Sequence, residues 1–341
     1  MNQRIFVTGG AGYIGSHTCV ELLNAGYDVT VFDNFSNSKG EALRRVERIT
    51  QKSVHTVQGD IRDKGTLQLA LQSSGACAVI HFAGLKSVGE SVASPLLYYD
   101  NNVVGTLRLL DAMQFCGVKT LVFSSSATVY GNPVALPIRE DHPLSATNPY
   151  GRTKLVVEDM LREAFVADPA WRFGILRYFN PVGAHRSGLI GEDPQGVPNN
   201  LLPFVAQVAV GHREYLNVWG DDYATPDGTG VRDYIHVVDL ALGHLRTLEA
   251  LSRAGAGQCI AINLGTGTGY SVLEMLRAFE AASGKPLPYR VQARRTGDVA
   301  ACYANPAYAA SLLGWTATRN LQTMCTDAWR WQSMNPLGYG V

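Results

Sequence analysis

The chain has 341 residues, of which 46% are hydrophobic and 17% are charged. This composition excludes an intrinsically disordered chain, and the length corresponds to about two domains at ~150 residues each. The 29 lysine and arginine residues balance the 29 aspartate and glutamate residues, so the basic excess typical of nucleic-acid binding is absent. We therefore expect a globular protein without a nucleic-acid partner.

Residues 67–85 and 120–138 lack charged side chains, but both stretches contain serines and other polar residues. They are typical of buried strands with adjoining turns and not of membrane helices. The N-terminal MNQRIFVTGG enters a strand without a secretory leader, and the six cysteines are scattered without a CxxC pair. We predict a cytoplasmic protein with reduced thiols, no bound metal and no membrane association.

Short apolar runs alternate with segments of helical length in the first half of the chain. The expected strands are residues 4–10, 27–33, 55–60, 77–84, 119–126 and 172–179, and the expected helices include 13–24, 95–115 and 149–165. This alternation predicts an α/β fold of the Rossmann type, with a doubly wound parallel sheet.

The composition changes after residue 180. Residues 180–200, NPVGAHRSGLIGEDPQGVPNN, predict an irregular, ligand-binding region, and the expected helices beyond it are 205–211, 238–251, 272–282 and 321–331. We predict a dinucleotide-binding domain over residues 1–180 and a smaller α/β substrate-binding domain over residues 181–341. Part of the later chain can also return to the first domain.

The first predicted turn carries a glycine motif that indicates a dinucleotide site. Gly9, Gly12 and Gly15 lie between a strand and a helix, where glycines let the backbone approach a pyrophosphate at the positive helix N-terminus. Asp33 ends the second strand, and its carboxylate can bind both ribose hydroxyls but would repel a 2′-phosphate. A plain glycine turn is the alternative, but this context favours NAD.

Residues at other strand ends are candidates for the same site, because ligands bind at the carboxyl ends of parallel strands. Asp60 can reach the adenine edge with Ile61 behind it, and Lys86 can donate to a ribose hydroxyl. The segment expected beside the pyrophosphate consists of Phe82, Ala83 and Gly84.

The motif NPYGRTK predicts a site for proton transfer. Tyr150 and Lys154 are four residues apart and therefore share one helix face. A tyrosine titrates near pH ~10, and lowering its pKa by about three units requires ~4 kcal/mol, which a nearby ammonium and an oxidised nicotinamide can supply. Ser124 and Ser126 end the preceding strand, where Ser126 can bind the reacting oxygen and Ser124 can hold Tyr150 or the nicotinamide.

Together these motifs resemble the extended short-chain dehydrogenase/reductase family, and within it the UDP-sugar 4-epimerases. The resemblance covers nearly the whole chain through TGGAGYIGSH, DNFSNSK, GDIRD, FAGLKSVGES, YYDNNV, SSSATVYG, NPYGRTK, RYFNPVGAH, GEDPQGVPNNLLP, GTGVRDYIHV, NLGTGTGYSV and WRWQSMNPLGY. It implies NAD-dependent interconversion of UDP-galactose and UDP-glucose, in which hydride leaves and returns at sugar C4 through a 4-keto intermediate.

The resemblance also implies roles for individual residues. Tyr150 is the acid and base, Lys154 binds the nicotinamide ribose and lowers the pKa of Tyr150, and Ser126 with Ser124 holds the 4-oxygen. Further cofactor residues are Tyr13, Ile14, Asn34, Asn37, Asn101 and Tyr178. Residues expected to bind the UDP-sugar are Asn180, Asn200, Leu201, Trp219, Arg232, Arg295, Asp298 and Cys302.

Cys302 departs from the tyrosine that some family members carry at this position, which borders the sugar C2 substituent. Its small side chain leaves room for an N-acetyl group and predicts activity on UDP-N-acetylglucosamine and UDP-N-acetylgalactosamine. Cys302 as a buried packing residue is the alternative. The family further implies a homodimer formed by residues 101–116 and 148–163.

Two other functions fit the same fold. A sugar-nucleotide 4,6-dehydratase needs an acid pair after the strand-end hydroxyl residue, where this chain has Ala127 and Thr128. A non-catalytic NAD sensor does not need the Ser126, Tyr150 and Lys154 constellation. Both are therefore less favoured than an epimerase.

Overall fold

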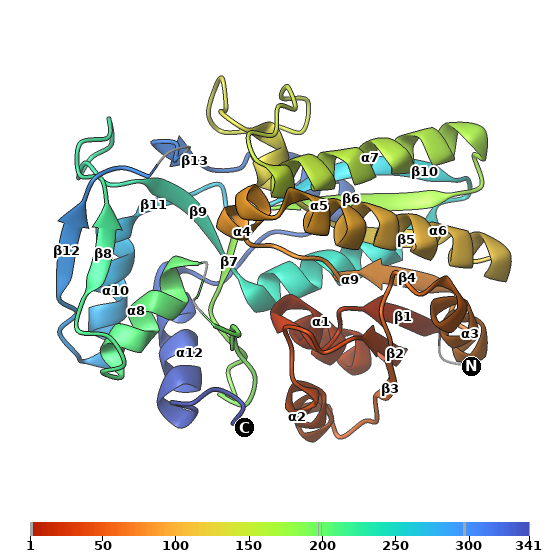
Figure 1. The fold of residues 1–341 in the computed structure, drawn as a ribbon, viewed down its shortest axis with the longest axis horizontal. Coiled ribbons are helices and arrows are strands. Elements are labelled where there is room, and N and C mark those ends of the chain that lie inside the picture. The colour runs from red at the N-terminus through yellow and green to blue at the C-terminus, as the bar shows by residue number, and fades with distance from the viewer. Residues whose placement is uncertain (1–2, 197, 199, 296–297, 341) are drawn as a thin grey trace.

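The computed structural model describes residues 3–196, 198, 200–295 and 298–340. A seven-stranded parallel sheet in the order β10-β6-β5-β4-β1-β2-β3 forms the centre of the larger lobe in Figure 1. Its strands are β1 (Arg4–Thr8), β2 (Asp28–Asp33), β3 (His55–Gln58), β4 (Ala78–His81), β5 (Thr120–Ser126), β6 (Arg172–Tyr178) and β10 (Gln258–Leu264). The predicted Rossmann-type parallel sheet is confirmed.

Helices cover both faces of this sheet. One face packs against α1 (Tyr13–Asn24), α2 (Gly40–Thr50), α9 (Val237–Arg253) and α11 (Ala307–Leu313). The other packs against α3 (Lys64–Ser74), α6 (Gly105–Cys116) and α7 (Pro149–Ala167). The expected helix 95–115 is divided into α5 (Pro95–Tyr98), a π-helix η1 (Tyr99–Val104) and α6, and it follows α4 (Val88–Ala93).

The second lobe contains two small sheets and three helices. In the first sheet β9 (Val231–His236) pairs with β7 (Asn180–Val182), β11 (Gly269–Ser271) and β13 (Ala301–Cys302); in the second β8 (Leu216–Trp219) pairs with β12 (Tyr289–Gln292). The helices are α8 (Leu201–Ala209), α10 (Val272–Ser283) and α12 (Leu321–Met334), and they share one apolar core.

The chain returns to the large sheet after entering the second lobe. Helix α9 packs against α1, and β10 adds a parallel strand beside β6, with Gln258 opposite Arg172 and Leu264 opposite Tyr178. Two separate segments of the sequence therefore build the larger lobe.

No helix within the described ranges is long and apolar enough to cross a membrane. All six cysteines lie within these ranges and are free thiols.

A buried charge pair connects α7 to the sheet. Arg177 is 1% exposed and Glu158 is 0% exposed. They form two parallel hydrogen bonds, Nε to Oε1 at 3.0 Å and Nη2 to Oε2 at 2.7 Å. Ser125 on β5 also donates to Glu158 Oε1 at 2.6 Å. The pair thus fixes α7 relative to β5 and β6 directly beneath their carboxyl ends.

We predict that Glu158→Gln lowers the free energy of unfolding by about 3–5 kcal/mol, because the buried Arg177 guanidinium loses its counter-charge. Urea denaturation followed by circular dichroism measures this change. Glu163→Gln on the exposed side of the same helix is the control and should change stability by less than about 0.5 kcal/mol. Equal effects of both substitutions would contradict the role assigned to the pair.

Candidate active site

The glycine turn after β1 leaves space for a ligand at the start of α1. Gly9 has φ of 70°, and a Cβ at this position would lie 2.6 Å from the backbone nitrogen of Ala83. Gly12 is the N-cap residue of α1 in extended conformation, without a side chain over the first turn. The free N–H groups and partial positive charge of this helix start can receive a diphosphate, so the turn fits a dinucleotide.

Asp33 lies at the end of β2, and its side chain binds the glycine turn that follows β1. Its carboxylate accepts hydrogen bonds from Ala11 N at 3.0 Å, Phe35 N at 2.9 Å and the Ser38 hydroxyl at 2.9 Å. The side chain is nearly buried, at 7% exposure. These bonds orient both oxygens, which have further lone pairs for ribose hydroxyls.

The two neighbouring strand ends supply a second acidic group. Asn34 donates to Asp60 Oδ2 at 3.1 Å, and Arg62 binds both oxygens of Asp60. Hydrogen bonds from Arg62 hold the pKa of the Asp60 carboxyl well below its usual range. Ile61 is buried against Gly105. Asp60 is therefore an anion at neutral pH, fixed by its own neighbours.

Several other predicted cofactor residues have protein partners in the structure. Tyr13 donates to Gly183 O at 2.7 Å, and Asn37 Oδ1 accepts from Gln195 N at 3.4 Å. Both contacts join the large lobe to the segment that follows β7. Ile14 packs against the apolar core behind the turn.

The segment after β4 closes the turn from the other side. Phe82 N and Ala83 N both donate to Thr8 O, at 2.9 and 3.1 Å. A Cβ at Gly84 would lie 3.7 Å from Lys154 Nζ, so the segment borders the proton-transfer residues. Asn101 donates to Asn102 Oδ1 at 2.9 Å and reaches the same region through Asn102.

Local sequence explains how α7 presents Tyr150 and Lys154. Asn148 caps the helix by accepting from Gly151 N at 2.9 Å, and Pro149 occupies the first helical position. Tyr150 is therefore in the first turn, half-buried, and Lys154 lies one turn further at 5% exposure. Lys154 Nζ donates to Ser124 O at 2.7 Å and lies 6.0 Å from the centre of the Tyr150 ring.

Burial disfavours the charged forms of both Tyr150 and Lys154. Burial raises the pKa of Tyr150, although a hydrogen bond with the Ser126 hydroxyl partly lowers it. Burial lowers the pKa of Lys154 to about 8. The expectation that Lys154 and an oxidised nicotinamide together lower the pKa of Tyr150 stays a prediction, because two neighbouring cations favour the phenolate.

Tyr178 extends this cluster along β6. It is 6% exposed, and its register opposite Ser126 brings it to the same end of the sheet. Burial and the nearby Tyr150 raise the pKa of Tyr178, whereas a hydrogen bond with Ser124 lowers it. The Tyr178 hydroxyl oxygen also lies 2.6 Å from Nε2 of the buried His244 on α9. The structure therefore brings together Ser124, Ser126, Tyr150 and Tyr178.

Three predicted substrate residues meet on the second lobe. Arg295 Nε donates to Asp298 Oδ2 at 3.0 Å, and its guanidinium lies 5.8 Å from the Trp219 ring centre. Trp219 ends β8 and is 40% exposed. An exposed aromatic face beside a cation and a carboxylate can stack a base and bind a ribose and a phosphate.

The remaining predicted substrate residues lie on β7, β9 and β13 and at the start of α8. Cys302 on β13 is opposite Arg232 on β9. Cys302 and Ala127, the residue after Ser126, both pack against one small apolar cluster, which consists of Val129, Tyr130, Ile138, Leu155, Phe179 and Ala304. Asn180 begins β7, and Asn200 is the N-cap residue of α8, which starts at Leu201, without a capping bond from its side chain. Ala127 and Thr128 begin the 3-10 helix η2 (Ala127–Tyr130) and provide no carboxylate beside Ser126.

Glu192 is a residue that sequence reasoning missed. Its Oε1 accepts from Lys86 at 3.1 Å and from Asn200 at 3.1 Å, so one carboxylate holds a predicted cofactor residue and a predicted substrate residue. The sequence offered only a weak signal, because Glu192 is one of two adjacent acidic residues, with Asp193, in the irregular segment 180–200.

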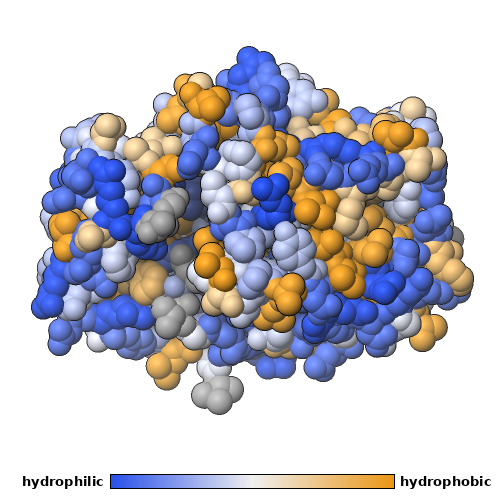
Figure 2. Space-filling model, turned by 45° about the horizontal axis from the view of Figure 1, so that its top comes forward, coloured by the Kyte–Doolittle hydropathy of each residue, from blue (hydrophilic) through white to orange (hydrophobic). Residues whose placement is uncertain are grey.

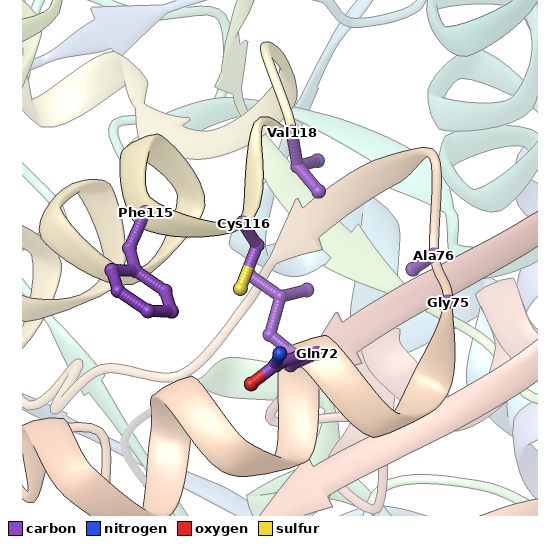
Figure 3. Close-up of a pocket in the computed structure, with 7 residues that line it drawn as sticks. Gln72, Gly75, Ala76, Phe115, Cys116 and Val118 are labelled. Carbon is purple, nitrogen blue, oxygen red and sulfur yellow. The ribbon is translucent and has the colours of Figure 1, made fainter.

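A pocket on the large lobe lies away from this site. Figure 3 shows a pocket of about 210 Å³ where α3 and α6 end, lined by Gln72, Phe115 and Cys116 among others. It lies at the amino ends of β4 and β5, opposite the glycine turn. Within the described residues, no group of three or more histidine, cysteine, aspartate or glutamate side chains can hold a metal ion.

Comparisons with known proteins agree with this geometry. A family model described as GDP-mannose 4,6 dehydratase matches residues 6–328. UDP-glucose 4-epimerase of Bacillus subtilis is 61% identical over 336 residues, which are 98% of each chain. UDP-glucose 4-epimerase of Mus musculus is 60% identical over 346 residues, 99% of each chain.

A crystal structure of Bifidobacterium longum UDP-glucose 4-epimerase in complex with NAD+ and UDP is also similar. It aligns with a TM-score of 0.95 at 54% identity, over 98% of this chain and 100% of that chain. The fold and the site define an extended short-chain dehydrogenase/reductase. Within this class, the matching family model is described as a dehydratase, whereas the relatives that match over the whole chain are epimerases. The chain belongs to the UDP-glucose 4-epimerase family.

Proposed function

We propose that the protein binds NAD and interconverts UDP-galactose and UDP-glucose by inverting the configuration at sugar C4. The observation that carries this proposal is the meeting of Tyr150 and Lys154 with the ends of β5 and β6, next to the glycine turn after β1. When bound, NAD supplies the acceptor that takes a hydride from C4 and returns it to the opposite face.

The residues of the first lobe hold this cofactor. The start of α1 binds the pyrophosphate, Asp33 binds the adenosine ribose, and Asp60 lies toward the adenine. Lys154 lies beside both Gly84 and Ser124 and binds the nicotinamide ribose. Lys86, which donates to Glu192 at 3.1 Å, would be available to hold the cofactor if that contact opened.

Tyr150 moves the proton. Its phenolate takes the proton of the sugar 4-hydroxyl, and Ser126 donates to the same sugar oxygen. Because burial raises the pKa of Tyr150, ionisation depends on the Lys154 ammonium and on the positive charge of the oxidised nicotinamide. This dependence couples the base to the oxidised cofactor, so Tyr150 becomes basic only when a hydride acceptor is present.

The second lobe binds the part of the substrate that does not react. Arg232 and Arg295 bind phosphate oxygens, Trp219 stacks on uracil, and Asp298 accepts from the uridine ribose. Asn180, Asn200 and Leu201 line the sugar pocket between the lobes. Strong binding of UDP keeps the intermediate in the site, while the weakly bound sugar is free to rotate and present its opposite face.

We also infer activity on UDP-N-acetylglucosamine and UDP-N-acetylgalactosamine. Cys302 is a short side chain opposite Arg232, and it packs against the same apolar cluster as Ala127, the residue after Ser126. A larger side chain in this position would occupy the volume of a C2 substituent.

A homodimer through η1–α6 and α7 is supported by the surface of the large lobe. Figure 2 shows hydrophobic side chains gathered over α5 to α7. Among them Leu96 is 82% exposed, Leu107 43% and Phe115 65%. Such a contiguous apolar surface is typical of an interface with another molecule. The domain division at residue 180 and the cytoplasmic location stay predictions.

We predict that Tyr150→Phe lowers kcat for UDP-galactose conversion by about a thousandfold, because the general acid and base is lost. The assay measures UDP-glucose formed without added NAD. Tyr308→Phe on the exposed side of α11 is the control and should retain full activity. Formation of a keto-deoxy sugar would indicate a dehydratase, and no product from the wild type would indicate a sensor.

We predict that Cys302→Tyr lowers kcat/KM for the N-acetylated substrates by about a hundredfold, through steric exclusion, and changes it only a few-fold for UDP-galactose. Cys302→Ser keeps the small volume and should retain both activities. Unchanged turnover of the N-acetylated substrates by Cys302→Tyr would reject the specificity role.

We predict that Leu107→Glu converts the dimer to a monomer, because it buries an unpaired charge at the interface. Size-exclusion chromatography with light scattering measures the mass. Val134→Glu, at an exposed position outside α5 to α7, should leave the mass unchanged. A monomeric wild type would refute the interface.

A further inference from the structure

The last described residues of the chain cross from the second lobe to the first. Residues 335–340, which we name the C-terminal strap, follow α12 and end between that helix and α2 (Figure 1). Lys39, the N-cap residue of α2, donates from Nζ to Gly340 O at 2.8 Å. The strap therefore joins the two lobes at the side of the sheet where β2 and α2 lie.

Arg45 on α2 provides the strongest contacts between the first lobe and the strap. Its Nη1 donates to Asn335 Oδ1 at 2.6 Å and to Leu189 O at 3.0 Å. Its guanidinium also lies 5.1 Å from the ring centre of Tyr339 and 5.7 Å from that of Trp331. The side chain is only 15% exposed, so these contacts are shielded from water and stabilise more than surface contacts do.

The strap is closely fitted to residues 188–193, which lie between β7 and α8. Tyr339 N donates to Asp193 Oδ2 at 3.0 Å, and the Tyr339 hydroxyl donates to Gly191 O at 3.2 Å. A Cβ at Gly338 would lie 2.0 Å from Asp193 Oδ1, so this approach requires glycine. The strap thus holds residues 188–193 through both backbone and side-chain contacts.

Residues 188–193 contact two of the predicted cofactor residues through Glu192. The Glu192 carboxylate accepts from Lys86 at 3.1 Å, and its carbonyl oxygen accepts from Trp331 Nε1 at 3.2 Å. Tyr13 in the first turn of α1 lies close to the same carboxylate, because burial, then Glu192 and then Tyr339 raise the pKa of Tyr13. The strap therefore borders the start of the helix that receives the pyrophosphate.

The end of the strap is connected to the residues expected at the adenosine ribose. Lys39 directly follows Ser38, whose hydroxyl donates to Asp33 at 2.9 Å. The Lys39 ammonium lies 2.8 Å from Gly340 O and 3.3 Å from Asp193 Oδ2. The loop that binds Asp33 is thus fixed at its end by the strap and by the segment under it.

We propose that the C-terminal strap fastens the second lobe onto the cofactor-binding lobe and slows the release of NAD during turnover, with Arg45 as its anchor. The inference rests on the proposed function, in which the first lobe binds NAD. Because the hydride that leaves C4 returns to the sugar, the reaction restores the oxidised cofactor in place and requires no exchange of NAD. Contacts that retain the cofactor therefore favour turnover without taking part in the chemical step.

The test compares Arg45→Met with Arg44→Met in the full-length, NAD-bound protein. Both arginines bind Glu41, at 2.9 Å and 2.7 Å, but within the described part of the chain only Arg45 also donates to the strap. Arg44 is 70% exposed, which makes it a matched control for loss of the Glu41 ion pair. Methionine keeps the apolar part of the side chain and removes the charge and the hydrogen bonds.

We expect Arg45→Met to increase the rate of NAD release by about tenfold or more, the scale of lost hydrogen bonds from a charged donor. Exchange of bound NAD for isotopically labelled NAD, followed by mass spectrometry of the denatured protein, measures this rate. Epimerase activity without added NAD should fall in parallel, and saturating NAD should restore it. Arg44→Met should exchange NAD at the wild-type rate.

Tyr339→Ala is a second variant that tests the inference should Arg45→Met not fold. It removes the ring beside Arg45 and the hydroxyl that binds Gly191, so it should also accelerate NAD release. Leu337→Ala is its control, because Leu337 belongs to the same strap but is 76% exposed.

The inference is wrong if Arg45→Met and Tyr339→Ala exchange NAD at the wild-type rate, or if the two controls accelerate exchange as much. It is also wrong if saturating NAD does not restore the activity of Arg45→Met, since the substitution would then disturb the site and not the retention of the cofactor. Failure of the proposed function is distinct, because the wild type would then contain no NAD or would lack epimerase activity at any NAD concentration.

Discussion

Lys154 donates from a buried ammonium group to the carbonyl oxygen of Ser124, 2.7 Å away. This bond joins α7 to the end of β5, and the arrangement of the other site residues depends on it. Burial of the ammonium is unfavourable, as its lowered pKa of about 8 indicates. The Arg177–Glu158 pair offsets this cost by holding α7 against β5 and β6 from beneath. The Arg177–Glu158 pair thus stabilises the structure beneath the site, while the site itself contains the Lys154 ammonium, whose burial is unfavourable.

The sequence predicted those parts of the fold that rest on local signals. The strand that ends at Asp33 and the helix from Tyr13 to Asn24 are set by apolar periodicity and by the glycines between them, and both are confirmed. The small strands of the second lobe were not predicted, because β13 has two residues and β7 has three. Strands this short are defined by their partners and not by their own composition.

The candidate site likewise contains residues that local sequence predicts and residues that only the folded structure reveals. Tyr150 and Lys154 are four residues apart, and any helix places two such residues on the same face. Their proximity could therefore be predicted from the sequence. Glu192 and His244 could not be found, because each acts through contacts with segments that are distant in sequence. His244 meets Tyr178 across 66 positions, and Glu192 meets Lys86 across 106. A lone histidine within an apolar helix is, from sequence alone, no different from an ordinary core residue.

The late position of β10 has a consequence for biosynthesis. Residues 258–264 complete the edge of the sheet beside β6, and α9 covers α1 only after residue 253 has been made. A nascent chain that has emerged only as far as β6 therefore exposes an unpaired strand and the apolar side of its first helix. Exposed strand edges of this kind bind other chains. The larger lobe therefore cannot complete its sheet or cover α1 until residues 237–264 are available, although most of its strands lie in the first 178 residues.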